Sequence, residues 1–261
     1  MSWASRKRFT ILSIIGIVIV AVVGGTAYLT LHQAPSCVDH KQNQDEEGID
    51  CGGMCTYLCS ASQAEPSAKF VLPLHPSEGR TDIIASIENP NPSSAAKNLK
   101  YTIELYSASN AVVARKVGTV DLPPSSAVPV FVPNIFSGSA TVARAFITFD
   151  SPEHLWFKYT DDRVIPKVRS VSFIPGDMPR VTATADNASS STLHNVLFIV
   201  TVFGADKNAL AASQTIVPTI PAHGSAPLVF TWTAPFAQTV SRIDVVPVIP
   251  LPADAALTLQ P

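Results

Sequence analysis

The sequence predicts an all-β protein carried by one N-terminal transmembrane helix, with a small disulfide-rich segment between that helix and two tandem β-sandwiches. Three observations lead to this fold class. Residues 9–31 form an apolar run without a charge, and all four cysteines fall within residues 37–59. Beyond the cysteines, short runs of β-branched and aromatic residues alternate with Pro, Asn, Gly and Ser, and no long helical pattern occurs.

The run at residues 9–31 is long enough to cross a bilayer, which takes roughly 20 apolar residues in a helix. Three basic residues precede it at positions 6–8, and the next Lys or Arg is Lys41. Basic flanks stay on the cytoplasmic side of a membrane. We therefore expect a cytoplasmic tip of residues 1–8 and a single-pass plasma-membrane protein with its C-terminal ectodomain outside.

Other interpretations of this run fit less well. A cleaved signal peptide has an apolar region of about 7 to 15 residues before a small-residue cleavage site. This run is longer, and residues 34–37 offer only a poor lipoprotein-type site. A buried helix of a soluble domain would carry a polar face, which the run lacks. We expect an uncleaved anchor.

The cysteine-rich segment, residues 37–59, contains five carboxylates and a single lysine. It has too few apolar side chains for a core, and small domains of this kind depend on disulfides or metals. Cysteines crowded together outside the cytoplasm indicate disulfides, and four cysteines can pair in three ways. We expect disulfides among Cys37, Cys51, Cys55 and Cys59, and all three pairings stay open.

The acidic residues of this segment predict a calcium site. Asp39, Asn43, Glu46 and Asp50 are spaced four, three and four residues apart, so a looped backbone can turn their oxygen atoms inward together. Calcium takes six to eight such oxygen ligands. Two alternatives stay open. One is an acidic linker with disulfides and no metal. The other is a zinc site, which oxidised cysteines and the Cys-x3-Cys-x3-Cys spacing disfavour.

The segment also resembles a cysteine-rich motif of bacterial and archaeal surface proteins, C-x-D-G-x-x-N-x-x-E-x-x-x-D-C-G-G-x-C-x-x-C. The matching positions are Cys37, Asp39, Asn43, Glu46, Asp50, Cys51, Gly52, Gly53 and Cys55. His40 stands where Gly is common, and the last pair of cysteines has three intervening residues. The resemblance implies an extracellular, disulfide-bonded and calcium-stabilised knot.

The rest of the chain repeats itself. Asn89 corresponds to Asn187 and Arg144 corresponds to Arg242, both at a separation of 98 residues. Similar strand-like runs lie between these positions in the same order. We therefore expect two copies of one domain, at residues 64–160 and 165–252, followed by a short tail.

Each copy is expected to form an immunoglobulin-like antiparallel sandwich, and the tail to cover residues 253–261. Six or seven short strands per copy, separated by turn-forming residues, are typical of that architecture. Tyr101 and Ile103 alternate with polar residues, which indicates one buried face. In the second copy, residues 196–200 are apolar on both faces and are expected to be better covered.

The first copy resembles the FxLYD domain of secreted bacterial and archaeal proteins. Ile103, Leu105 and Tyr106 fit that motif, and Ser107 replaces its Asp. The second copy matches more loosely, through Val200, Val202, Phe203 and Gly204. The resemblance implies a small sandwich module at the cell surface and brings no catalytic residues.

No catalytic motif stands out, so we expect no enzyme. Ser94 and Lys97 have the Ser-x-x-Lys spacing of penicillin-binding enzymes but lack the accompanying motifs. The aromatic residues Trp156, Phe157 and Tyr159 lie near the junction of the two copies. They predict interdomain packing or a last strand, or else a surface for a protein or glycan partner.

Three functions are compatible with this pattern. The first is a non-enzymatic binding or spacer module at the cell envelope, which meets a protein or glycan partner. The second is an accessory subunit of a secretion, pilus-like or cell-wall machine, in which Gly16, Ala21, Gly24 and Gly25 would pack against another helix. The third is a hydrolase with an unrecognised site at the domain junction. A net charge of −2 gives no argument for a nucleic-acid partner.

Overall fold

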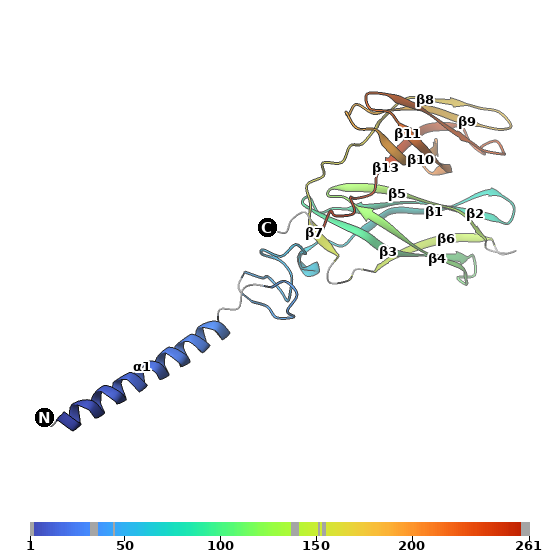
Figure 1. Cartoon of the computed structure of the whole chain (residues 1–261). Coiled ribbons are helices and arrows are strands. Elements are labelled where there is room, and N and C mark those ends of the chain that lie inside the picture. Colours follow the sequence, from blue (N-terminus) through green and yellow to red (C-terminus); the bar gives the residue numbers. More distant parts are fainter. Residues whose placement is uncertain are drawn as a thin grey trace.

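The computed structural model describes residues 3–31, 36–43, 45–136, 141–150, 152 and 155–256. Residues 1–2 of the expected cytoplasmic tip and residues 257–261 of the expected tail lie outside this range. The described chain contains one long helix, a short 3₁₀ turn and thirteen strands (Figure 1). The all-β fold class with an N-terminal helix is therefore confirmed.

The helix is α1 (Trp3–Leu31) and the turn is η1 (Ser60–Ser62). The strands of the first half are β1 (Ser67–Ser77), β2 (Arg80–Asn89), β3 (Ser94–Ser107), β4 (Val112–Leu122), β5 (Ser126–Phe136), β6 (Val142–Asp150) and β7 (Trp156–Lys158). Those of the second half are β8 (Lys167–Ile174), β9 (Arg180–Asp186), β10 (Leu193–Gly204), β11 (Ala209–Ile220), β12 (Ser225–Thr231) and β13 (Val240–Val248).

Helix α1 extends away from the rest of the molecule (Figure 1). Its segment Lys7–Leu29 is long and apolar enough to cross a membrane, and none of it is buried by the protein. A 29-residue helix is about 43 Å long, which exceeds the roughly 30 Å hydrocarbon core of a bilayer. Apolar side chains on all sides need an environment other than water, because no polar face is left for solvent.

The first sandwich consists of a β1-β2-β5 sheet and a β4-β3-β6 sheet, and the short β7 pairs with the start of β3. Side chains alternate along a strand, so β2 turns Ile83, Ala85 and Ile87 into the space between the sheets. Ile103 and Leu105 of β3 complete this part of the core, and all five side chains are buried.

The second sandwich repeats the same strand order, as a β8-β9-β12 sheet and a β11-β10-β13 sheet. Its core contains Phe198 and Val200 of β10 and Phe230 of β12. Asn89 and Asn187, which correspond in the internal repeat, make the same contacts in the two halves. Both side chains are buried and donate from Nδ2 to backbone carbonyls across the loop that follows.

The two sandwiches pack sheet against sheet, so that four sheets form a stack (Figure 1). The β1-β2-β5 sheet uses Leu74 and Ile84 in this interface, and the β11-β10-β13 sheet uses Ile199 and Ala212. Strand β10 therefore faces its own core on one side and the first sandwich on the other. Seven consecutive residues of β10, positions 198–204, are buried, as its apolar pattern predicts.

Proline positions follow the sheet topology. Within the described strands, prolines occur only in edge strands, and the central strands β2, β3, β9 and β10 contain none. A proline cannot donate a hydrogen bond to a neighbouring strand, so it is tolerated at an edge and hinders pairing there. The strand prolines are Pro73, Pro76, Pro129, Pro133, Pro218, Pro227 and Pro247. They make these sheet edges poor templates for an additional strand.

Candidate functional site

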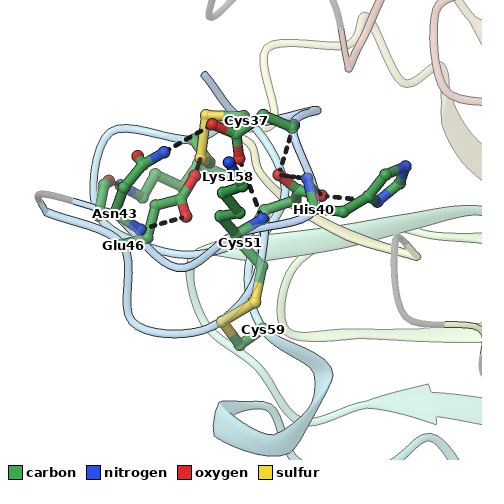
Figure 2. Close-up of a disulfide and its surroundings, with 12 residues drawn as sticks. Cys37, His40, Asn43, Glu46, Cys51, Cys59 and Lys158 are labelled. Atoms are coloured by element: carbon green, nitrogen blue, oxygen red, sulfur yellow. Dashed lines mark hydrogen bonds and ion pairs between the residues drawn. A yellow bond between two sulfur atoms is a disulfide. The ribbon is translucent and has the colours of Figure 1, made fainter. Parts of the chain in front are cut away.

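The cysteine-rich segment is held by two disulfides, Cys37–Cys55 and Cys51–Cys59 (Figure 2). The bonds interleave in sequence, because Cys51 lies inside the loop that Cys37–Cys55 closes. Cys51 and Cys55 are buried and take the place of an apolar core. The structure thus selects one of the three pairings that the sequence allows. We call residues 37–59 the knot.

Asp50 holds the first part of the knot in place. Its carboxylate is buried and accepts hydrogen bonds from the backbone amides of Asp39, at 3.0 Å, and His40, at 2.9 Å. The His40 Nδ1 lies 3.1 Å from the same carboxylate. A buried carboxylate is stable when such donors replace water. Asp50 therefore works as a backbone clamp between residues 39–40 and the second disulfide.

The other three predicted ligands form a second set of contacts (Figure 2). The Asn43 Nδ2 donates to the Asp39 carboxylate at 2.7 Å, and the Asn43 backbone amide donates to the Glu46 Oε2 at 3.2 Å. The remaining side-chain oxygen of Asn43, Oδ1, is buried and has no hydrogen-bond partner. The structure therefore brings the carboxylates of Asp39 and Glu46 to the amide groups of Asn43, whose side-chain oxygen stays without a partner.

The knot fits calcium in part. Asn43 Oδ1 is an oxygen without a hydrogen-bond partner, on a residue that contacts two carboxylates, and oxygens of both types are ligands that calcium prefers. Asp50 fits less well, because its oxygens already accept backbone amides. Calcium binding stays a prediction, and the residues best placed to hold the ion are Asp39, Asn43 and Glu46.

A zinc site fits poorly. Among the described residues, the one group of three His, Cys, Asp or Glu side chains with ligand atoms within 4.8 Å of each other is Cys37, Glu46 and Cys55. The two sulfur atoms are bonded to each other and cannot act as thiolates. The Glu46 Oε1 lies 3.3 Å from Cys55 Sγ, which is a contact and not a hydrogen bond, because a disulfide sulfur carries no hydrogen.

Two glycines are required by the path of the knot. Gly52 and Gly53 have φ angles of +77° and +55°, in the left-handed region that favours glycine. A Cβ on Gly53 would lie 1.7 Å from the backbone oxygen of Asp45. Gly52 is therefore needed for its positive φ, and Gly53 is needed both for its φ and for close approach to the backbone of Asp45.

The knot is joined to the first sandwich through β7. The Leu58 amide donates to the Trp156 carbonyl at 2.8 Å, and Tyr57 pairs with Phe157 as an antiparallel bridge. The Lys158 Nζ donates to the carbonyl of Gly53 at 2.8 Å (Figure 2). The knot is therefore continuous with the first sandwich.

The partner-surface interpretation of the aromatic segment is wrong for two of its three residues. Trp156 is 2% exposed and belongs to the first core, and Phe157 is 1% exposed beneath Leu251. Both residues lie in the last strand of the first sandwich, β7, which pairs with β3. Tyr159 is half-buried, and burial together with the nearby Asp162 raises its pKa.

Ser94 and Lys97 also have structural roles. Both lie on strand β3, whereas the enzyme motif requires a helix. Ser94 is buried and its hydroxyl donates to Gln63 Oε1 at 2.6 Å. The Lys97 ammonium donates to the carbonyl of Pro252.

The sequence did not predict a role for the C-terminal tail, which returns to the first sandwich. We call residues 249–256 the strap. The Leu251 amide donates to Asp121 Oδ2 at 2.8 Å, and the Arg163 guanidinium donates to the Ile249 carbonyl. Leu251 and Ala255 are buried against the first sandwich. In the sequence, only the apolar residues of this short segment could have indicated the contact.

A groove of about 670 Å³ lies between the two sandwiches. Phe131, Leu197 and Val248 contribute apolar walls, and Asp121 and Arg163 lie at its border with the strap. Both charged groups already have partners, because Asp121 accepts the Leu251 amide and Arg163 pairs with Asp161.

No protein-family profile matches the chain, so the knot motif and the FxLYD pattern remain resemblances. No curated protein matches it either. Among solved structures, it is similar to a transglutaminase of red sea bream, at 14% identity and a TM-score of 0.25. That similarity covers 71% of this chain and 29% of the transglutaminase.

Proposed function

We propose that this chain is a single-pass membrane protein whose ectodomain is a non-enzymatic binding or spacer module outside the cytoplasm. Two features together carry the proposal. The apolar helix is not buried by the rest of the protein, and the knot and the two sandwiches of the proposed ectodomain are packed against each other. The knot pairs with β7, the sandwiches pack sheet on sheet, and the strap ties the second sandwich to the first.

The proposed orientation rests on charge and on cysteine chemistry. Of the two segments that flank the apolar run, only the N-terminal one carries basic residues, at positions 6–8. This asymmetry favours a cytoplasmic N-terminus. The two disulfides are compatible with an oxidising compartment on the other side. The length of the apolar run, residues 9–31, supports an anchor that stays attached, because a signal peptide has an apolar region of only about 7 to 15 residues.

Protease treatment of intact cells tests this proposal. With tags at both ends of the chain, the C-terminal tag should be lost and the N-terminal tag should stay on a membrane-bound fragment. Secretion of a full-length ectodomain without the N-terminal tag would instead identify a signal sequence. Protection of the C-terminal tag would contradict the orientation.

A second candidate is an accessory subunit of an envelope assembly for secretion, pilus formation or cell-wall processing. The helix supports it, because a Cβ placed on Gly16, Gly24 or Gly25 would meet nothing within 4 Å. Open glycines on a membrane helix allow close approach of another helix. Cross-linking in native membranes distinguishes the two functions: a monomer favours the spacer module, and a specific attached subunit favours the assembly.

A further inference from the structure

The large apolar side chains of the knot are of two kinds, those packed against the first sandwich and those exposed to solvent. Tyr57 and Leu58 are half-buried and face the first sandwich. Val38 is 80% exposed, Ile49 is 52% exposed and Met54 is 64% exposed. An acidic segment with few apolar residues thus leaves its three remaining large ones in contact with solvent.

Two of these side chains stand at the tips of tight turns. Ile49 lies between Gly48 and Cys51, which form an antiparallel bridge. Met54 lies in the turn that the Cys55 amide closes on the Gly52 carbonyl at 2.9 Å. Apolar side chains on rigid turn tips, held by disulfides, can enter another phase without any rearrangement of the backbone.

The membrane is close to this surface. Helix α1 ends at Leu31, and Val38 follows seven residues later. A chain of that length spans at most about 25 Å, even when it is fully extended. The polar layer of a bilayer begins where the hydrocarbon core ends, and it is about 5 to 8 Å thick on each side. The knot is therefore the part of the ectodomain that the anchor holds next to the membrane.

We infer that Val38, Ile49 and Met54 form a membrane-contact surface that enters the polar layer of the bilayer. This inference rests on the proposed function as an anchored protein. Because the knot is bonded to β7, its contact with the membrane also fixes the direction in which the stacked sandwiches point.

The charge of the knot determines which lipid surface it fits. Asp45 and Glu47 are exposed and Asp39 is partly exposed, against the single Lys41. Carboxylates are repelled by anionic headgroups and tolerated beside zwitterionic ones. The surface therefore fits a phosphatidylcholine-like bilayer better than one rich in phosphatidylserine.

Tryptophan quenching by brominated acyl chains tests the contact. The full-length protein is reconstituted in brominated phosphatidylcholine vesicles in a Trp3→Phe background, which removes the tryptophan of the anchor. Trp156 and Trp232 remain, so the signal of this background is subtracted from that of each variant. Met54→Trp is compared with Met178→Trp, a matched control that is 76% exposed in the turn between β8 and β9. We expect brominated lipid to quench the Met54→Trp signal severalfold more than the Met178→Trp signal.

Three further results keep the test decisive. Equal quenching of the two variants would overturn the membrane contact, and Ile49→Trp supplies an independent position if Met54→Trp misfolds. Failure of the protein to float with the vesicles would instead overturn the anchor and the contact together. Replacing part of the phosphatidylcholine by brominated phosphatidylserine should reduce the difference in quenching between Met54→Trp and Met178→Trp. A larger difference would contradict the charge argument.

Discussion

At the scale of single residues, buried polar side chains define the loops of this protein. Asn89 is 2% exposed and donates to the carbonyls of Ser94 and Pro123, each at 2.8 Å. Asn187 is 1% exposed and donates to Ser191 at 2.7 Å and Pro221 at 3.0 Å. Each asparagine satisfies carbonyls that would otherwise be buried without donors.

Replacing either asparagine by alanine should destabilise its sandwich by about 1 to 3 kcal/mol, since buried carbonyls lose their donors. The measurement is urea unfolding of the Asn89→Ala and Asn187→Ala variants. Asn208→Ala is the control, because Asn208 is exposed and should change stability by less than about 0.5 kcal/mol. Equal effects of the buried and exposed substitutions would contradict this role.

Asp161 makes part of the stability depend on pH. A hydrogen bond from the Arg163 side chain, and then the charge of Arg163, lowers the pKa of Asp161 below its usual value. The contribution of ionised Asp161 to the free energy of unfolding is therefore fully present above the unfolded-state pKa of about 3.9. It is lost as the pH falls through the lower folded-state pKa. Acid unfolding of Asp161→Asn should show a weaker pH dependence below about pH 4 than the parent chain.

At the scale of elements, the knot combines two disulfides, a buried carboxylate clamp and two glycines with positive φ. These features replace an apolar core in a segment that lacks one. The unpartnered Asn43 Oδ1 is the one buried side-chain oxygen or nitrogen without a hydrogen bond among the described residues. Such an atom normally has a partner, and a calcium ion is one that its neighbours would accept.

Calcium should therefore stabilise the knot, because binding free energy to a folded site adds to folding free energy. Calorimetric titration of the oxidised full-length protein in detergent should show binding with a dissociation constant of about 10⁻⁴ to 10⁻³ M. Asn43→Ala should weaken binding by about tenfold, while Lys41→Ala should leave it unchanged or slightly tighter. No heat up to about 10 mM calcium would exclude the metal site and leave a disulfide-bonded acidic knot.

At the scale of the whole molecule, the β-rich part is a stack of four sheets. The strap and residues 159–166, the linker between β7 and β8, hold the stack together. Ile84 of β2 is fully buried between the sandwiches, and Ile199 of β10 is 3% exposed there. The Arg163 guanidinium connects the linker to the strap through the Ile249 carbonyl. Apolar contact between sheets and these polar ties should make the two sandwiches unfold together.

An Ile84→Asp substitution should separate the sandwiches, because it leaves an unpaired carboxylate in an apolar interface at a cost of about 3 to 5 kcal/mol. We expect a larger radius of gyration in small-angle scattering and two thermal transitions in place of one. Val229→Asp is the control, because Val229 is 50% exposed and needs no partner. A compact Ile84→Asp variant with one transition would show that the interface does not depend on this contact.

The sequence alone determined the features that depend on composition and short-range order. The charge-free run became one helix, the cysteine cluster became disulfides, and alternating residues such as Ile83, Ala85 and Ile87 became core-facing strand positions. The continuous apolar pattern of β10 also indicated burial on both faces. Local periodicity and residue type are sufficient for these predictions.

Only the tertiary structure decided which distant groups meet. It selected Cys55 as the partner of Cys37, buried Trp156 and Phe157, and brought the strap back to Asp121. The sequence does not distinguish an aromatic residue in a core from one on a surface, because its environment depends on chain segments far away in the sequence. The free energy of such a contact depends on both residues, and the local sequence around one residue does not identify the other.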